Sequence, residues 1–460
     1  YLLIGFWFKD PYNGYCARKA FVVTRVGDAS MAMGLFLLFA NLGTLNIQEL
    51  MFLAEENWAV GSGIAVAVTL LLLGGAVGKS AQLPLQTWLP DAMAGPTPIS
   101  ALIHAATMVT AGVYLIARTH ILYELAPSVQ FLVGVIGMIT LLMAGFTALV
   151  QNDIKKVLAF STVSQIGYMF LALGVGAYSS AIFHLMTHAF FKALLFLTAG
   201  SIILAMHHEQ DIFKMGGLRK DLPWSHALFL IGTIALVAIF PTSGYWSKEE
   251  ILASALTTEG AYMLWIGGVA GAFMTGLYSF RLYFLVFFGK KTHDGHEVMG
   301  WNLQGPLVAL AVLSLLGGFI HIPVEEVFHA HAEEHHVSVF YQAIMIGLPL
   351  IGILFAYLIF IKQKVDVNKF AASGFGAKLH RFFFTQWGMD WLYDRVFVDP
   401  YTGLARLNKQ DFVDSIYNGT ASLTRYCHSL VIQTQTGQLR WYTISMACGV
   451  LLIVSIGVFA

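Results

Sequence analysis

Charged residues are scarce in this sequence of 460 residues, at 11% of the total, and they cancel, with 26 Lys+Arg against 26 Asp+Glu. A soluble domain carries about 25% charged residues. Intrinsic disorder is excluded, because it requires few apolar residues and a large net charge. No basic stripe with interleaved aromatic side chains occurs, which argues against nucleic acid as a partner.

Cysteine is equally scarce. Cys16, Cys427 and Cys448 lie far apart and form no C-x-x-C motif, which argues against a disulfide scaffold, a thiolate zinc site and an iron–sulfur cluster. A signal peptide is also missing, since no basic segment precedes an apolar core and a small-residue cleavage site. Residues 1–8 are apolar and do not begin with Met, so we expect the chain to start as the tail of a transmembrane helix truncated upstream.

Apolar residues, by contrast, make up 57% of the chain, and the mean hydropathy is +0.69. A spanning helix needs about 20 predominantly apolar residues. We therefore predict an all-α, polytopic membrane protein with about eleven complete transmembrane helices. The windows lie at about 20–42, 58–78, 99–117, 130–152, 157–177, 181–206, 224–257, 260–280, 304–322, 337–361 and 441–460.

Basic residues segregate when the loops are assigned alternately to the two sides of the membrane. One side receives the clusters around residues 9–19, 155–156, 214–220 and 290–291, together with the basic residues of 362–440. The opposite side carries Arg118 as its one basic residue, among many glutamates. Because the Lys and Arg bias sets orientation, we predict that the basic side faces the cytoplasm or, in an organelle, the matrix.

The segment 363–440 differs in kind, because it is long, polar and charged. We predict that it contains a long amphipathic lateral helix on the cytoplasmic side, held at its far end by the span 441–460. A loosely attached surface helix is the alternative. The apolar stripe that supports a helix consists of Phe412, Ile416, Leu423 and Leu430.

An acidic loop on the opposite side contains residue types that bind metals. We interpret it as a solvated loop, and we predict no metal site in this chain. Its histidines are His329, His331, His335 and His336.

Ionisable side chains within the predicted spans are the main functional signal, since each costs several kcal/mol at bilayer depth and by default marks an ion or substrate path. Asp28, Glu249 and His104 belong to this group. The others are His184, His188, Arg25, Lys79, Lys192, Lys248 and Arg281.

His184, His188 and Lys192 follow one another at four-residue spacing, and we call them the polar row. On a helix they form a stripe about 12 Å long on one face. Histidine titrates near neutral pH, and lysine can do so when it is desolvated, so a proton relay is the favoured interpretation. Two core histidines bonded to carbonyls beside a snorkelling lysine are the alternative. Bis-histidine haem ligation is disfavoured, because only His104 remains as a facing ligand.

Two of the intramembrane lysines are predicted beside helix breaks. Lys79 precedes Pro84 and Pro90, which cannot continue a regular helix, and Lys248 follows Pro241. Freed backbone groups and water can line a cavity at such a break. A lysine at an ordinary helix end is the alternative for each position.

An internal repeat accompanies the two breaks. Residues 108–118 and 273–281 share an M-T-G-x-Y-x-R core, and each segment follows a lysine-bearing break by one span. An odd number of spans separates the breaks, which predicts inverted-topology repeats. We predict the remainder of a first repeat at 1–128, a second repeat at 129–290, two additional helices at 301–362, the lateral helix at 363–440 and the anchoring helix at 441–460.

Residues 78–109, GKSAQLPLQTWLPDAMAGPTPISALIHAATMV, resemble the signature of the antiporter-like subunits of respiratory NADH:quinone oxidoreductase (complex I) and of related cation/proton antiporters. The segments FSTVSQIGY (160–168) and FHLMTHAFFKALLF (183–196) extend the resemblance. The motif GMDWLYDR (388–395) and the lateral helix are similar to the distal subunit of that complex.

The resemblance implies a proton-translocating, non-redox subunit in a bacterial inner membrane, with lipids and neighbouring antiporter-like subunits as partners. NADH, FMN, iron–sulfur clusters and quinone would belong to the rest of the complex, and no cofactor would be bound by this chain. A subunit of a multisubunit sodium/proton antiporter is the alternative function. A purely structural role, in which the lateral helix clamps the neighbouring subunits, is a further one.

The same resemblance assigns roles to individual residues. Lys79 would serve the first half-channel, and the acidic partner of its family counterpart would lie upstream of Tyr1. Asp153 is similar to the family's acidic residue near the cytoplasmic end of its helix. The central connection would consist of His104, His184, His188 and Lys192, the second half-channel of Lys248 and Glu249, and Arg25 and Asp28 would flank the missing glutamate.

Overall fold

The computed structural model describes residues 1–291, 294–298, 300–320, 323, 327–328, 337–364, 369, 373–409 and 411–459. Within these residues the chain is helical and contains no strand, only an isolated bridge between Asp153 and Asp211. The predicted all-α class is therefore confirmed. The loop histidines 329–336 lie outside the described residues. The chain divides into two compact units, residues 1–389 and 390–460.

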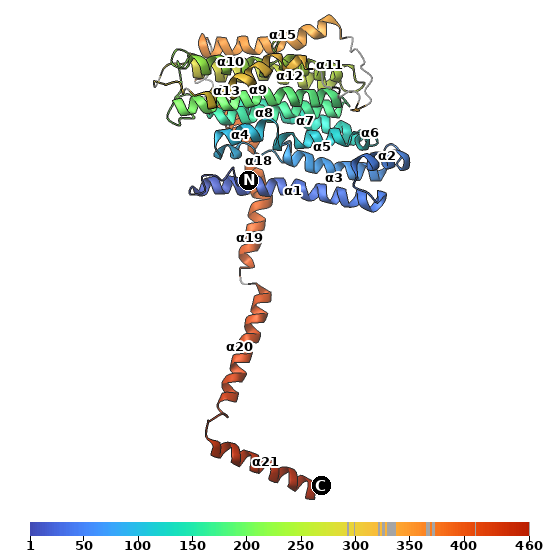
Figure 1. The fold of residues 1–460 in the computed structure, drawn as a ribbon, viewed down its shortest axis with the longest axis vertical. Coiled ribbons are helices and arrows are strands. Elements are labelled where there is room, and N and C mark those ends of the chain that lie inside the picture. Colours follow the sequence, from blue (N-terminus) through green and yellow to red (C-terminus); the bar gives the residue numbers. More distant parts are fainter. Residues whose placement is uncertain are drawn as a thin grey trace. The chain divides into compact units, whose positions relative to one another are not determined.

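The helices of the first unit lie side by side in a stack that begins at α1 and ends at α15 (Figure 1). They are α1 (Pro11–Leu42), α2 (Ile47–Asn57), α3 (Gly63–Lys79), α4 (Thr97–Ala105), α5 (Ala111–Arg118), α6 (His120–Glu124), α7 (Pro127–Ala148), α8 (Ile154–Gly174), α9 (Tyr178–Ala205), α10 (Pro223–Val237), α11 (Ser243–Thr257), α12 (Tyr262–Phe288), α13 (Trp301–Leu316), α15 (Val339–Ala356) and α17 (Gly374–Phe384).

Nine helical segments in the described part of the chain are long and apolar enough to cross a membrane. Two shorter apolar helices, Gly63–Lys79 and Pro223–Val237, end at the interruptions described below. The total of about eleven complete spans stays a prediction. The nine are Pro11–Leu42, Thr97–Arg118, Pro127–Ala148, Ile154–Gly174, Tyr178–Ala205, Tyr262–Phe288, Trp301–Phe319, Val339–Ile361 and Leu439–Phe459.

Both predicted helix breaks are present. After Lys79 the backbone runs through turns to the short 3-10 helix η1 (Asp91–Ala94), and residues 238–242 separate α10 from α11. A third interruption, at residues 106–110 between α4 and α5, falls inside a window expected as one continuous helix.

Two boundaries at the start of the chain also differ from expectation. Residues 2–9, expected as the tail of a helix, form turns. Helix α1 begins at Pro11 instead of residue 20, because the Asp10 side chain caps it by accepting a hydrogen bond from the Tyr12 backbone N–H.

Helix α8 is the centre of the first unit, and all residues of its spanning window are buried. It packs on α7 through facing glycines, since a Cβ added to Gly174 would lie 2.2 Å from the Gly134 nitrogen, and one added to Gly137 would lie 2.5 Å from the Gly167 carbonyl oxygen. Small residues allow membrane helices to approach backbone to backbone. This approach holds α8, with its polar side chains, against neighbours on every side.

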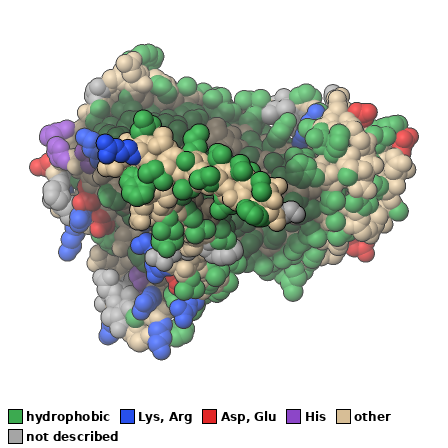
Figure 2. All heavy atoms as spheres, turned by 90° about the horizontal axis from the view of Figure 1, so that it is seen from below, with side chains coloured by type: hydrophobic (Ala, Val, Ile, Leu, Met, Phe, Trp, Pro, Cys, Tyr) green, Lys and Arg blue, Asp and Glu red, His purple; other side chains and the backbone are tan. Residues whose placement is uncertain are grey.

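The outer surface is apolar, as expected for a multi-pass membrane protein. Large side chains such as Phe36 on α1 and Leu354 on α15 are more than half exposed. Figure 2 shows apolar side chains over much of the visible surface. A lipid environment would cover this surface, because lipid tails are as apolar as the side chains themselves.

The second unit consists of helices, and the predicted helix over the stripe 412–430 is observed as α20 (Phe412–Ile432). Its N-terminus is capped by Asp411, whose carboxylate accepts a hydrogen bond from the Val413 backbone N–H. The other helices are α18 (Met389–Tyr393), which begins one residue before the unit, α19 (Asp399–Leu407) and α21 (Leu439–Phe459).

The glycine contact between α7 and α8 yields a stability prediction. Gly174→Ala would force the two backbones apart, and overpacking of this kind costs about 1–3 kcal/mol. We expect the purified protein in detergent to lose its monodisperse peak at a lower temperature. Gly14→Ala is the matched control, because its Cβ would meet no atom within 4 Å. Equal melting of the two variants would contradict the packing argument.

Candidate functional site

Lys79, at the C-terminal end of α3, is paired with an acidic residue of α1. Its Nζ lies 3.0 Å from Asp28 Oδ2 and donates a hydrogen bond of 3.0 Å to the Tyr1 hydroxyl. Arg25 Nε lies 3.8 Å from the same carboxylate oxygen. Asp28 therefore bridges two cations, and among the described residues it is the carboxylate bonded to Lys79.

Glycines bring this ion pair together. A Cβ added to Gly27 on α1 would lie 2.8 Å from the Gly74 carbonyl oxygen and 3.1 Å from the Gly78 Cα on α3. The two helices therefore cross in close contact one residue away from Asp28 and Lys79. Membrane helices use small residues for such close approach.

The polar row lies on α9, and its three side chains are buried, with 1% or less of each exposed. His184 connects two other helices to this row. Its Nδ1 lies 2.9 Å from Ser247 Oγ on α11, and its Nε2 lies 3.2 Å from Gln165 Oε1 on α8. Thr187 Oγ1 lies 2.8 Å from the same serine oxygen. A connected set of hydroxyl, amide and imidazole groups therefore links α8, α9 and α11.

The helix interruption between α4 and α5, which the sequence did not predict, frees a backbone carbonyl that accepts a hydrogen bond from His188 of the polar row. His188 Nδ1 lies 3.0 Å from the carbonyl oxygen of Ala105, the last residue of α4. A carbonyl can only accept, so Nδ1 carries the proton, and Nε2 of the neutral ring is an acceptor. That Nε2 has no protein partner among the described residues. It is therefore open to receive a proton.

His104 also lies on α4, and it is fully buried. Neither ring nitrogen has a hydrogen-bond partner in the described part of the chain, and the ring lies 5.0 Å from that of Phe196 between centroids. His104 interacts electrostatically with Lys192 and His188 across the contact between α4 and α9. The predicted central residues therefore come together in space.

Lys192 points into the protein and is not at the membrane surface. Its Nζ donates to the Leu158 carbonyl oxygen at 3.3 Å and to the Ser161 hydroxyl, both on α8. The side chain is completely buried, so snorkelling to the interface does not describe it. A carbonyl and a hydroxyl accept from a lysine without neutralising its charge.

Lys248 lies on α11, directly after the second break. Its Nζ is buried, has no hydrogen-bond partner within the described residues, and lies 4.5 Å from the centroid of the Tyr168 ring. A cavity of about 20 Å³ beside it is lined by Tyr245, Lys248 and Glu249 of α11 together with apolar residues of α11, α12, α15 and the break. That is about the volume one water molecule needs.

The acidic residues of α11 differ in their surroundings. Glu249 lines the small cavity and is partly buried. Glu250, which the sequence did not single out, accepts a hydrogen bond of 2.8 Å from Ser180 Oγ on α9. The sequence carried no signal for this contact, because the two residues lie 70 positions apart.

Asp153 caps the N-terminus of α8. Its Oδ1 accepts from the backbone N–H groups of Lys155 at 2.7 Å and Lys156 at 3.2 Å. Burial raises the pKa of the Asp153 carboxyl, and these two hydrogen bonds oppose that shift. Arg281 Nη1 donates to the nearby Gln151 carbonyl oxygen at 2.9 Å. Both predicted residues therefore act on the turn between α7 and α8.

Lys155 was expected in a basic loop, and that expectation is wrong. Its side chain is buried, and its Nζ donates to the carbonyl oxygens of Met93 at 2.6 Å and Gly95 at 3.2 Å. These carbonyls lie at the end of η1, where the broken segment after Lys79 has no further helix to satisfy them. Lys155 therefore joins α8 to the first break.

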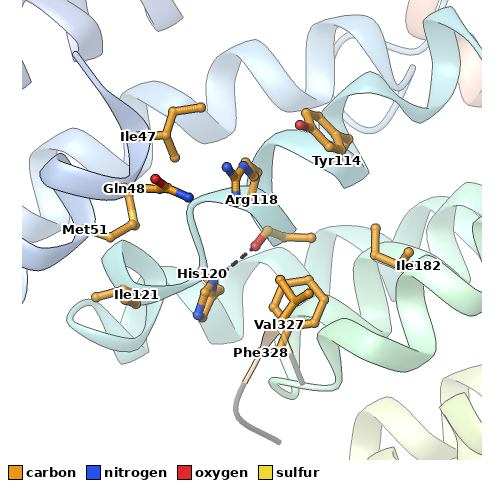
Figure 3. Close-up of a pocket in the computed structure, with 11 residues that line it drawn as sticks. Ile47, Gln48, Met51, Tyr114, Arg118, His120, Ile121, Ile182, Val327 and Phe328 are labelled. Carbon is orange, nitrogen blue, oxygen red and sulfur yellow. Dashed lines mark hydrogen bonds between the residues drawn. The ribbon is translucent and has the colours of Figure 1, made fainter. Parts of the chain in front are cut away.

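A larger cavity of about 540 Å³ lies apart from these residues. Figure 3 shows it between α2, α5, α6 and α9, with Arg118 and His120 as its cationic and imidazole side chains and mostly apolar residues around them. None of the predicted site residues lines it. The side chains of the polar row are instead buried among α8, α9, α11 and α4. The described residues contain no group of three or more His, Cys, Asp or Glu that could hold a metal ion.

Comparison with known proteins gives consistent results. The family described as NADH:quinone oxidoreductase/Mrp antiporter, TM, matches residues 1–275. NADH-quinone oxidoreductase subunit L of Escherichia coli (strain K12) is 53% identical over 459 residues, which cover 99% of this chain and 75% of the relative. Subunit L of Pseudomonas aeruginosa (strain PAO1) is 53% identical over 460 residues, which cover 98% of this chain and 74% of the relative.

One solved structure, that of an Mrp complex from Dietzia sp. DQ12-45-1b, matches with a TM-score of 0.71 at 24% identity, over 93% of this chain and 47% of that one. This likeness shows the fold alone. The sequence identity to the two subunit L proteins and the family match establish family membership as well. The chain therefore belongs to the NADH:quinone oxidoreductase/Mrp antiporter transmembrane family, and within it to the subunit L proteins of NADH-quinone oxidoreductase.

Proposed function

We propose that this chain translocates protons as a non-redox membrane subunit of an NADH:quinone oxidoreductase, driven by quinone reduction elsewhere in the complex. The assignment to this complex rests on the names of its relatives, which are subunits L of NADH-quinone oxidoreductase. The observation that carries the translocation step is the burial of four ionisable side chains, His184, His188 and Lys192 on α9 and Lys248 on α11, where His184 is hydrogen-bonded to Ser247, the residue before Lys248. Ionisable groups at this depth are costly and mark ion paths.

The proposed path begins at the first break. Lys79 and Arg25 share the Asp28 carboxylate, so a charge change in a neighbouring subunit would shift the balance between the two pairs. The altered field would change the free energy of placing a proton on the buried groups. Moving one proton against 100 mV requires about 2.3 kcal/mol, which is the scale of a single charged hydrogen bond.

The middle of the path is the polar row. A proton would bind His188 at its open Nε2, and the resulting imidazolium would be stabilised by the Ala105 carbonyl on the other nitrogen. His184, with Ser247 and Gln165 on its two nitrogens, would pass protons toward α11. Lys192 and Lys248 repel each other electrostatically, so a proton arriving on one would favour release from the other.

We further propose the bacterial inner membrane as the location, with the basic side of the chain facing the cytoplasm. The second unit would lie along that side and contact neighbouring antiporter-like subunits. Within the first unit, residues 1–128 and 129–290 would form two inverted repeats. In support, a helix that carries an arginine in its C-terminal half follows each lysine-bearing break, with Arg118 as the last residue of α5 and Arg281 within α12.

A sodium/proton antiporter subunit is the second candidate. The structural likeness to the Mrp complex favours a shared fold, and the 53% identity to subunit L proteins favours NADH-quinone oxidoreductase. Sodium dependence of transport and co-purification with small antiporter subunits, without flavin and iron–sulfur subunits, would support the second candidate instead.

The relay predicts a loss of pumping in Lys192→Ala. Removal of the ammonium would interrupt the path between α9 and α8, so proteoliposomes with the intact complex should pump fewer protons per NADH oxidised. Lys220→Ala is the control, because Lys220 is an exposed lysine outside the row. An unchanged proton-to-NADH ratio in Lys192→Ala would overturn the relay.

The bridging position of Asp28 yields a second prediction. Asp28→Asn would leave Lys79 and Arg25 without their shared carboxylate, and we expect slower proton pumping with the complex still assembled. Pumping should be measured by acidification of inverted membrane vesicles, normalised to NADH oxidation. Glu55→Gln removes an exposed carboxylate from α2 as the matched control. Equal pumping in both variants would argue against a role for the Asp28 bridge.

A further inference from the structure

Lys248 differs from the other buried lysines in what surrounds its ammonium group. Lys192 and Lys155 donate hydrogen bonds to oxygen atoms of the protein. Lys248 Nζ has no such oxygen among the described residues, and no ion pair joins it to a carboxylate there. The ammonium group lies instead over the face of the Tyr168 ring, with 4.5 Å between Nζ and the ring centroid.

The neighbouring Glu249 does not replace that partner. Adjacent residues on a helix point about 100° apart. Glu249 lines the same small cavity as Lys248, but its carboxylate is hydrogen-bonded to the Tyr245 hydroxyl. Lys248 interacts electrostatically with His184 and Lys192 on α9, and two of these groups repel each other when both hold a proton.

The Tyr168 ring is held firmly in place. It is fully buried on α8, and its hydroxyl donates a hydrogen bond of 2.5 Å to the Gly268 carbonyl oxygen on α12. Gly271, one turn further along α12, leaves room for the hydroxyl, because a Cβ there would lie 2.8 Å from it. The glycines of α12 therefore fix the height and angle of the ring beneath the Lys248 ammonium.

An aromatic face stabilises a cation through its quadrupole, and the effect is strongest where water is excluded. It does so without accepting a proton and without a full negative charge, so it favours the protonated lysine yet leaves the proton free to move on. A carboxylate in the same position would hold the charge as a fixed ion pair. The ring is thus suited to a lysine that must be loaded and unloaded repeatedly.

We propose that Tyr168 is a positioning residue for proton transfer at Lys248, acting through the face of its ring while α12 holds its hydroxyl. This inference rests on the proposed function. The inference adds one requirement: proton transfer at Lys248 needs an aromatic ring at position 168, and it does not need the hydroxyl of that ring.

The test compares two replacements in the assembled complex. Tyr168→Leu removes the ring, and Tyr168→Phe keeps the ring and loses the hydroxyl with its hydrogen bonds to Gly268 and Thr275 of α12. Inverted membrane vesicles report protons pumped per NADH oxidised, with Lys248→Ala as the reference for full loss. We expect Tyr168→Leu to fall several-fold toward that reference, and Tyr168→Phe to stay near the unmodified complex.

Phe170→Leu is the matched control, because it is the same loss of a buried ring on the same helix, on the side packed against Gly137 of α7. It should pump normally. If Tyr168→Leu fails to assemble, Tyr168→Met supplies an unbranched side chain of similar size without a ring. Its pumping should fall in the same way.

The possible results distinguish the role of the Tyr168 ring from the role of Lys248 itself. Equal losses in Tyr168→Phe and Tyr168→Leu would assign the effect to the hydroxyl and overturn the inference. Normal pumping in Tyr168→Leu with loss in Lys248→Ala would overturn the inference and leave the proposed function standing. Normal pumping in Lys248→Ala would remove the proposed role of Lys248 itself.

Discussion

The cost of burying charge in a membrane protein is the constraint on which this structure depends. Removing an ammonium or imidazolium from water is tolerated only where other groups replace the lost hydration. Helix α8, at the centre of the first unit, provides such groups. Its Ser161, Gln165 and Tyr168 contact buried ionisable side chains of α9 and α11, which are Lys192, His184 and Lys248 respectively. Its close glycine contacts with α7 keep these groups at the distances that the cations require.

Interrupted helices meet the same need in a different way. A continuous helix satisfies its own carbonyls, whereas a broken one leaves them available. The end of α4 offers the Ala105 carbonyl to His188, and the end of η1 offers two carbonyls to Lys155. These two interruptions are therefore also places where a buried donor is satisfied. The break beside Lys248 differs, because the Lys248 ammonium has no hydrogen-bond partner among the described residues.

The sequence predicted the parts of this arrangement that have local signals. Runs of apolar residues indicated the helices, and prolines indicated the breaks beside Lys79 and Lys248. Four-residue spacing indicated the row on α9. Residues 106–110 contain no proline or glycine, so the sequence carries no local signal that predicts the helix break there. The pairing of Asp28 with Lys79 and the ring beneath Lys248 depend on residues 51 and 80 positions apart, and a single sequence carries no pattern for such contacts.

The different surroundings of the two central lysines bear on direction. A relay of identical sites has no intrinsic preference for either end. Here Lys192 is held by a carbonyl and a hydroxyl, which must reorganise when its proton leaves, whereas Lys248 faces a ring that needs no reorganisation. Hydrogen bonds to charged groups are worth about 1.5–3 kcal/mol, comparable with the work of moving one charge against 100 mV. If the proposed relay operates, a difference of this size between oxygen and ring would make Lys192 the storage site and Lys248 the release site.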